Sequence, residues 1–117
     1  MDSIVKDKSK KLAVRIIRLY QYLNEEKREY VMSKQVLRAG TSIGANVREA
    51  LEGQSKADFT AKMSIALKEA SETEYWLELL YETEYMSAEQ YTSIAGDCKE
   101  LVKLLTSIVK TSRTNRN

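Results

Sequence analysis

The stretch "LRAGTSIGANVREALEG", Leu37 to Gly53, decides the fold. Its apolar and small residues recur every three or four positions, which predicts an amphipathic helix. Gly40 and Gly44 fall within the apolar stripe, although a glycine inside a helix costs about 1 kcal/mol relative to alanine. Their missing side chains favour close packing of another helix against this face. The alternative is a cleft in which a ligand approaches the backbone.

Outside this stretch the chain of 117 residues contains few helix breakers, with no proline and, beyond Gly53, only Gly96. Such a chain is expected to be all-α. Apolar stripes at helical spacing predict four helices, near residues 3–23, 30–52, 55–84 and 87–111. Gly53 is expected to adopt a left-handed conformation just after the second helix.

Helix-start signals precede three of the four predicted helices. They are Asp2 or Ser3, then Ser55 with Asp58, then Ser87 with Gln90. The connections are short, and short connections between long amphipathic helices imply antiparallel neighbours. We therefore predict an antiparallel up-down-up-down four-helix bundle over residues 1–112, followed by a frayed basic tail at 113–117.

The composition argues against an enzyme. Histidine is absent, which excludes His-based catalytic triads and nearly every zinc site. Glu69 and Glu72 form a carboxylate pair, but di-iron bundles also need histidines. Cys98 lies on the apolar seam of the fourth helix and is expected to be a buried thiol. We expect no catalytic residues, no cofactor and no metal.

The sequence also indicates where the protein works. Its first residues contain no apolar run of signal-peptide length, and no stretch approaches the roughly 20 apolar residues of a membrane span. A single cysteine fits a reducing compartment. We therefore expect a cytoplasmic protein that does not enter a membrane.

Two helical faces look unsuited to water. Short polar residues line one side of the second helix. The simpler interpretation by spacing alone is a solvated face, although such a face would more naturally carry Lys, Glu or Gln. The third helix has a second stripe that contains its tryptophan, and the alternative is that this residue only widens the core. We predict that both faces meet other protomers, through Arg38, Ser42, Asn46, Glu49, Ile65, Glu69, Glu72, Trp76 and Leu79.

Basic residues are concentrated near both ends of the chain. Residues 1–23 carry six basic and two acidic side chains. A basic surface repeated in an oligomer could bind a polyanion, although solvated lysines are the simpler explanation. The candidate nucleic-acid-binding residues are Lys6, Lys10, Lys11, Arg15, Arg18, Lys110, Arg113 and Arg116.

Most of the chain resembles a known family. The pattern is carried by Arg38, Ser42, Ile43, Ala45, Asn46, Glu49, Phe59, Lys62, Ala66, Lys68, Glu69, Ser71, Glu72 and Trp76. It resembles the bacterial four-helix-bundle proteins encoded in intervening sequences of large-subunit ribosomal RNA genes. The resemblance covers residues 16–105 and implies a left-handed bundle, a homopentameric ring and no established catalytic activity. The accessory protein of diversity-generating retroelements, a basic pentamer, looks like a distant member.

Two function classes stay open at this point. The first is an oligomeric helical scaffold or interaction protein that docks a protein partner and is not an enzyme. The alternative is a ring-forming protein associated with RNA through its basic surfaces. Whichever class applies, the expected partners of the protein are other copies of itself, in a pentamer by resemblance, and either RNA or a nucleic-acid-processing protein.

Overall fold

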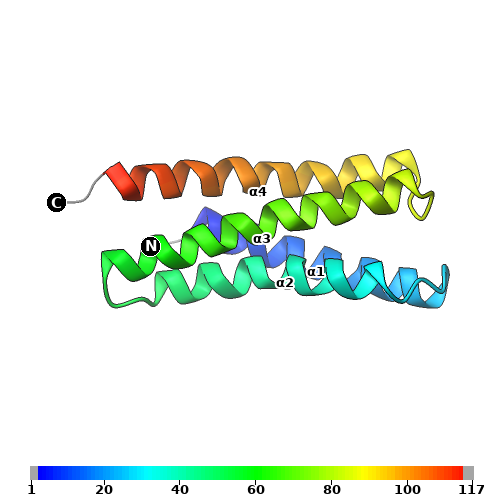
Figure 1. The fold of residues 1–117 in the computed structure, drawn as a ribbon, viewed down its shortest axis with the longest axis horizontal. Helices are drawn as coiled ribbons and strands as arrows, with labels where there is room; N and C mark the ends of the chain where they lie inside the picture. The colour runs from blue at the N-terminus through cyan, green and yellow to red at the C-terminus, as the bar shows by residue number, and fades with distance from the viewer. Residues whose placement is uncertain (1–2, 115–117) are drawn as a thin grey trace.

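The computed structural model describes residues 3–114, which form four antiparallel helices (Figure 1). They are α1 (Ile4–Glu25), α2 (Met32–Leu51), α3 (Lys56–Glu82) and α4 (Ala88–Thr114). No strand occurs within these residues, and the predicted all-α bundle is confirmed. Helix α4 continues through residues 113 and 114, which we expected to lie in a frayed tail.

Three helix starts carry the capping bonds that the sequence signals predict. The Ser3 hydroxyl accepts a hydrogen bond from the backbone N–H of Lys6, at 3.1 Å. Ser55 does the same for Asp58 at 3.0 Å. The Ser87 hydroxyl accepts from the Gln90 N–H at 3.1 Å, while the Gln90 side chain accepts from the Ser87 N–H at 2.8 Å. This reciprocal pair satisfies two N–H groups that a helix start leaves without partners.

Helix α2 begins with a cap that the sequence did not reveal. The carboxylate of Glu29 accepts hydrogen bonds from the backbone N–H groups of Val31, Met32 and Ser33, at 2.7–3.2 Å. Arg28 precedes it with a φ of 53°, a left-handed conformation that turns the chain after α1. Glu29 is buried by this arrangement, and its charge faces the positive end of the helix dipole.

The predicted left-handed conformation of Gly53 is wrong, because no described glycine has a positive φ. The turn between α2 and α3 is instead tightly packed at this glycine. A Cβ at position 53 would lie 3.2 Å from the Ala50 carbonyl oxygen and 3.3 Å from the Asp58 Cβ. Gly53 therefore allows the end of α2 and the start of α3 to approach closely.

The core runs the length of the bundle and is built from the predicted stripes. Every helix contributes side chains that are at most a few per cent exposed, and α1 and α4 share the loosest of the four seams. The larger buried side chains are Leu12, Ile16, Leu23, Val36, Ile43, Val47, Met63, Leu77, Leu80, Ile94, Leu101 and Leu105. The bundle is elongated, with principal extents of 50 × 23 × 20 Å.

Candidate interaction surfaces

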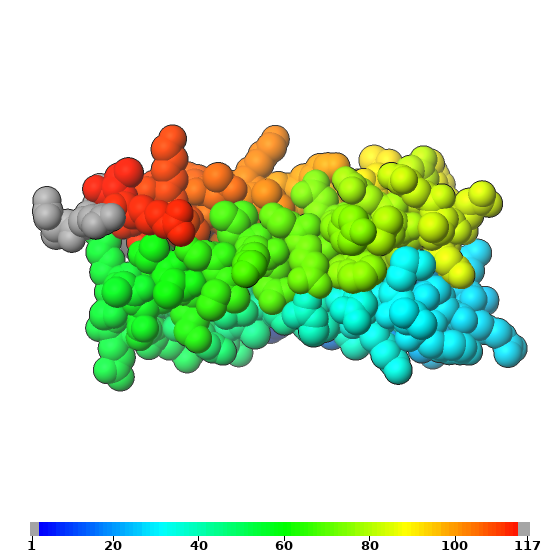
Figure 2. Space-filling view, viewed as in Figure 1, coloured from blue at the N-terminus to red at the C-terminus, as the bar shows by residue number. Residues whose placement is uncertain are grey.

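The predicted protomer-contact residues all belong to α2 and α3, and these two helices adjoin on the side of the molecule that Figure 2 shows. At its centre the guanidinium of Arg38 bridges two carboxylates of α3. Its Nη1 lies 3.3 Å from Oε1 of Glu69, and its Nη2 lies 2.5 Å from Oε2 of Glu72. Trp76 donates its indole N–H to the same Glu72 oxygen at 3.0 Å. The four side chains form one polar cluster across two helices.

The charges of this cluster stabilise one another. The indole N–H of Trp76 and then the guanidinium of Arg38 lower the pKa of Glu72 below its ordinary value, because both donate to the ionised form. The pKa of Arg38 is raised in turn, first by the hydrogen bond to Glu72. Since half of the Arg38 side chain is exposed, water screens the pair and its contribution to stability is small.

The short polar residues of α2 already have partners within the protomer. The Ser42 hydroxyl donates to the Arg38 carbonyl oxygen at 2.6 Å, and the Asn46 amide donates to the Ser42 carbonyl oxygen at 2.9 Å. Glu49 pairs with Lys62 of α3 at 2.8 Å. Sequence reasoning about the interface missed Lys62, since nothing local signals a pairing between two helices.

Apolar side chains lie among these polar groups. Ile65 is 41% exposed and Tyr75 is 53% exposed, while Leu79 and Trp76 are half-buried. The rings of Tyr75 and Trp76 meet edge to face, with centroids 5.5 Å apart. We call this surface the α2–α3 strip; it comprises the nine predicted residues together with Lys62 and Tyr75.

The predicted basic residues do not form one patch. Arg15 is tied to α4, with its Nη1 2.6 Å from Oδ2 of Asp97, and Arg113 donates to the Ser64 hydroxyl at 3.3 Å. Arg116 lies outside the described residues. Residues Lys11, Arg18 and Lys110 are exposed on separate parts of α1 and α4.

Two of the predicted basic residues line a groove between α1 and α2. Lys6 and Lys10 come from α1, and Arg48, which sequence reasoning did not select, comes from α2. We call this the Gly44 groove. Its volume is about 240 Å³, no acidic residue lines it, and its lining is completed by Ser9, Ala13, Thr41, Gly44 and Ala45.

Gly40 and Gly44 both face α1, but at different distances. A Cβ at position 40 would fall 2.7 Å from Cγ1 of Ile16, so no other residue fits without movement. A Cβ at position 44 would lie 3.5 Å from the carbonyl oxygen and the hydroxyl of Ser9, which is ordinary van der Waals contact. Gly40 is buried, and Gly44 is half-buried beside the groove.

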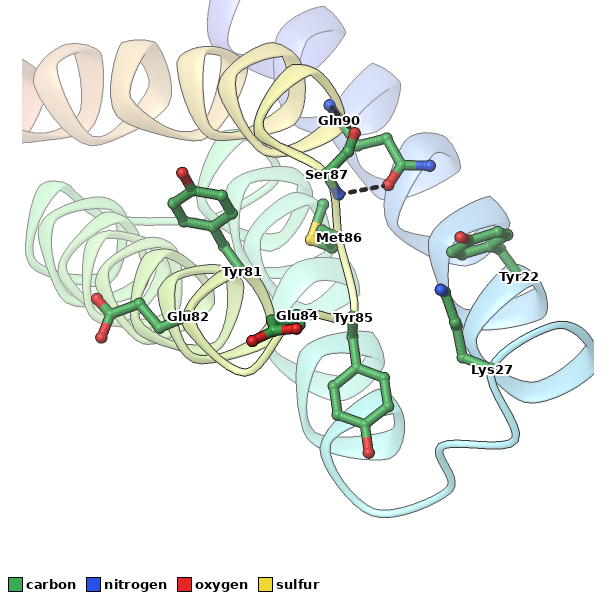
Figure 3. A pocket seen from close by; sticks show the side chains of 9 residues that line it. All are labelled: Tyr22, Lys27, Tyr81, Glu82, Glu84, Tyr85, Met86, Ser87 and Gln90. Atoms are coloured by element: carbon green, nitrogen blue, oxygen red, sulfur yellow. Dashed lines mark hydrogen bonds between the residues drawn. The ribbon is translucent and has the colours of Figure 1, made fainter.

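A larger groove lies at the opposite end of the bundle, where α1 faces the turn between α3 and α4 (Figure 3). Its volume is about 830 Å³. Figure 3 shows Tyr22 and Lys27 on its α1 side and Met86 and Gln90 on the other. The lining also includes Glu82 and Glu84, so this groove selects neither anions nor cations by charge.

Two kinds of side-chain group bear on chemistry in the described part of the chain: the metal-ligating residue types and the single cysteine. Within residues 3–114, no three His, Cys, Asp or Glu side chains gather closely enough to hold a metal ion. The Cys98 thiol is buried and donates to the Ala70 carbonyl oxygen at 3.3 Å. Burial raises the pKa of this thiol to about 12, so it stays protonated at neutral pH and is a weak nucleophile. None of the four described helices is long and apolar enough to cross a membrane.

Comparison with known proteins agrees with the resemblance found in the sequence. The family model described as 23S rRNA-intervening sequence protein matches residues 1–107. A crystal structure of a protein of unknown function from the S23 ribosomal protein family of Bacteroides thetaiotaomicron is 64% identical. It aligns with a TM-score of 0.90 over 92% of this chain and 99% of that one. None of the curated proteins compared with the chain matches it.

Proposed function

The chain belongs to the family of 23S rRNA-intervening sequence proteins, and from that premise we propose that it is a non-enzymatic helical scaffold. It assembles with copies of itself through the α2–α3 strip and docks a protein partner. The ring of five copies is inherited from the family resemblance, whereas association as such is argued from the residues of this chain.

The observation that carries the proposal is the apolar content of the strip. Ile65 is exposed between the Glu49–Lys62 pair and the Arg38 cluster along α3, and the Tyr75–Trp76 pair continues the same side. Protein interfaces are enriched in Trp, Tyr and Arg, and their apolar centres are surrounded by polar rims. The paired charges suit burial, because a paired and hydrogen-bonded charge costs less to remove from water than a free one.

The test exploits two isoleucines with equal exposure. Ile65 and Ile17 of α1 are both 41% exposed, but only Ile65 lies on the strip. Ile65→Glu places a charge in the proposed contact and is expected to convert the oligomer to monomer in size-exclusion chromatography with light scattering. Ile17→Glu is the matched control and should leave the mass unchanged.

Circular dichroism of both variants should match the wild type, since both side chains are at the surface. A monomeric wild type at micromolar concentration would contradict the proposal. So would an Ile65→Glu variant that keeps the mass of the wild type.

A second candidate function, association with RNA, is favoured by the distribution of charge along the bundle. The antiparallel order brings residues 3–12, 44–63 and 104–114 to one end of the bundle. These residues carry nine basic and four acidic side chains. At the other end, residues 17–35 and 75–93 carry four basic and seven acidic side chains. A basic end attracts a polyanion with an affinity that falls as salt rises. Salt-dependent binding of RNA by the wild type tests this candidate.

A further inference from the structure

The glycine at position 44 has no explanation in the packing of the protomer. A Cβ there would make only ordinary contacts, at 3.5 Å, with Ser9. Alanine is favoured over glycine inside a helix by about 1 kcal/mol. The chain therefore gives up stability at this position without needing the space for its own core. The missing side chain instead leaves the backbone of α2 open beside the groove that α1 and α2 enclose.

The rims of the Gly44 groove carry a single sign of charge. Lys6 and Lys10 border it from α1 and Arg48 from α2, and no acidic residue lines it. Within the described part of the chain, the side chains of these three residues make no ion pair and no hydrogen bond. This contrasts with Arg15, Arg38 and Lys62, each of which has an acidic partner.

We propose that the Gly44 groove binds phosphate groups of a nucleic-acid backbone, through Lys6, Lys10 and Arg48. Three cations without acidic partners, on two helices, suit the closely spaced negative charges of a phosphate backbone. Arg and Lys are the residues that most often hold phosphates. Small residues between them let the ligand approach the helix backbone. The groove lies at the basic end of the bundle, so the long-range field also favours a polyanion.

The proposed contacts are to the backbone of the nucleic acid and not to its bases. The binding is therefore independent of sequence and sensitive to salt. This inference rests on the second candidate function, and it assigns that function to a defined place in the fold.

The experiment measures the affinity for a fluorescein-labelled oligouridylate by fluorescence anisotropy over a range of salt concentrations. The triple variant Lys6→Gln, Lys10→Gln, Arg48→Gln should lose about tenfold or more in affinity at low salt. The slope of log affinity against log salt should fall by about 2, since each neutralised phosphate of a single strand contributes about 0.7.

The control variant removes the same charge elsewhere. Lys34, Lys68 and Lys103 are exposed and do not line the groove, so their triple replacement with Gln should leave the affinity within about twofold and the slope nearly unchanged. A second variant, Gly44→Leu, fills the groove without changing any charge. It should lower the affinity severalfold, with a melting temperature and mass measured alongside.

Each other outcome overturns a defined part of the inference. Equal losses in both triple variants would show a general effect of charge and would remove the groove as the site. Wild-type binding that the groove variants leave intact would overturn the groove but keep RNA as a partner. Absence of binding by the wild type at low salt would overturn both. Polyglutamate serves as a competitor at equal charge concentration. If it displaces the oligouridylate and binds more tightly than the oligouridylate does, the occupant of the groove is an acidic peptide.

Discussion

Gly40 and Gly44 lie one turn apart on the same face of α2, and both face α1, yet they do different things. At Gly40 the Ile16 side chain occupies the space where a Cβ would be, so the two helices interlock. At Gly44 the opposing group is the backbone and hydroxyl of Ser9, at a distance that leaves room for a methyl group. The same residue type therefore allows tight packing against α1 in one turn and leaves unfilled space in the next. We call position 40 the closed position and position 44 the open position.

This difference shows that a glycine in an apolar stripe has two separable meanings. One is steric complementarity, in which a larger residue clashes with a rigid neighbour. The other is the exposure of backbone to something outside the core. Only the distance to the facing helix distinguishes them, and three predictions test the distinction.

The largest effect is expected at the closed position. Gly40→Leu should overpack the contact with Ile16 and destabilise the protein by about 1–3 kcal/mol or more, because a well-packed core cannot absorb the added volume without shifts. Urea denaturation followed by circular dichroism measures the change.

The same experiment contains its own check. Replacing Ile16 with alanine removes the opposing side chain, so Ile16→Ala should cost less in the Gly40→Leu background than in the wild type. If the two costs simply add, the contact with Ile16 is not the reason for glycine at position 40.

A smaller effect of opposite sign is expected at the open position. Gly44→Ala should raise the stability by about 0.5–1 kcal/mol, because alanine fits at van der Waals distance and is the better helix former. Thermal unfolding at low protein concentration provides the measurement. Gly40→Ala is the matched comparison and should lower the stability, because its Cβ would lie 2.7 Å from Ile16. Equal losses in the two alanine variants would contradict the difference between the two positions.

The smallest effect concerns the charges beside Gly44. Replacing Lys6, Lys10 and Arg48 with glutamine should change the stability by no more than about 0.5 kcal/mol, in the stabilising direction, because three unpaired like charges no longer repel one another. Added salt should reduce the difference by screening that repulsion in the wild type. A large loss of stability would mean that these side chains support the fold and are not held free for a ligand.

Much of the fold could be predicted from the sequence because its signals are local. The spacing of Leu12, Ile16 and Leu23 defines a buried face through the helical period alone. The Ser55 and Ser87 caps act within their own first turns. The absence of proline left no competing interpretation, so the number, order and approximate bounds of the helices followed directly.

Local signals failed where the chain departs from the usual residue for a position. A glutamate two residues before the N-cap is not a usual capping signal, yet Glu29 accepts from three N–H groups, and Arg28 before it has a left-handed conformation. Gly53 carried the usual signal for a left-handed residue, but the turn uses it for close approach to Asp58. In both turns the path of the chain between helices decided the outcome.

The sequence by itself determined that four amphipathic helices form and which face of each is apolar, because both depend on contacts within a few residues. Only the tertiary structure decided which side chains meet across helices. It paired Arg38 with Glu69 and Glu72 and brought Arg48 beside Lys6 and Lys10. It also decided that Gly40 packs against the Ile16 side chain and that Gly44 lies beside the backbone of Ser9. Distances between helices depend on the axial offset and rotation of whole packed elements, and these are fixed by the core as a unit and not by any one stretch of sequence.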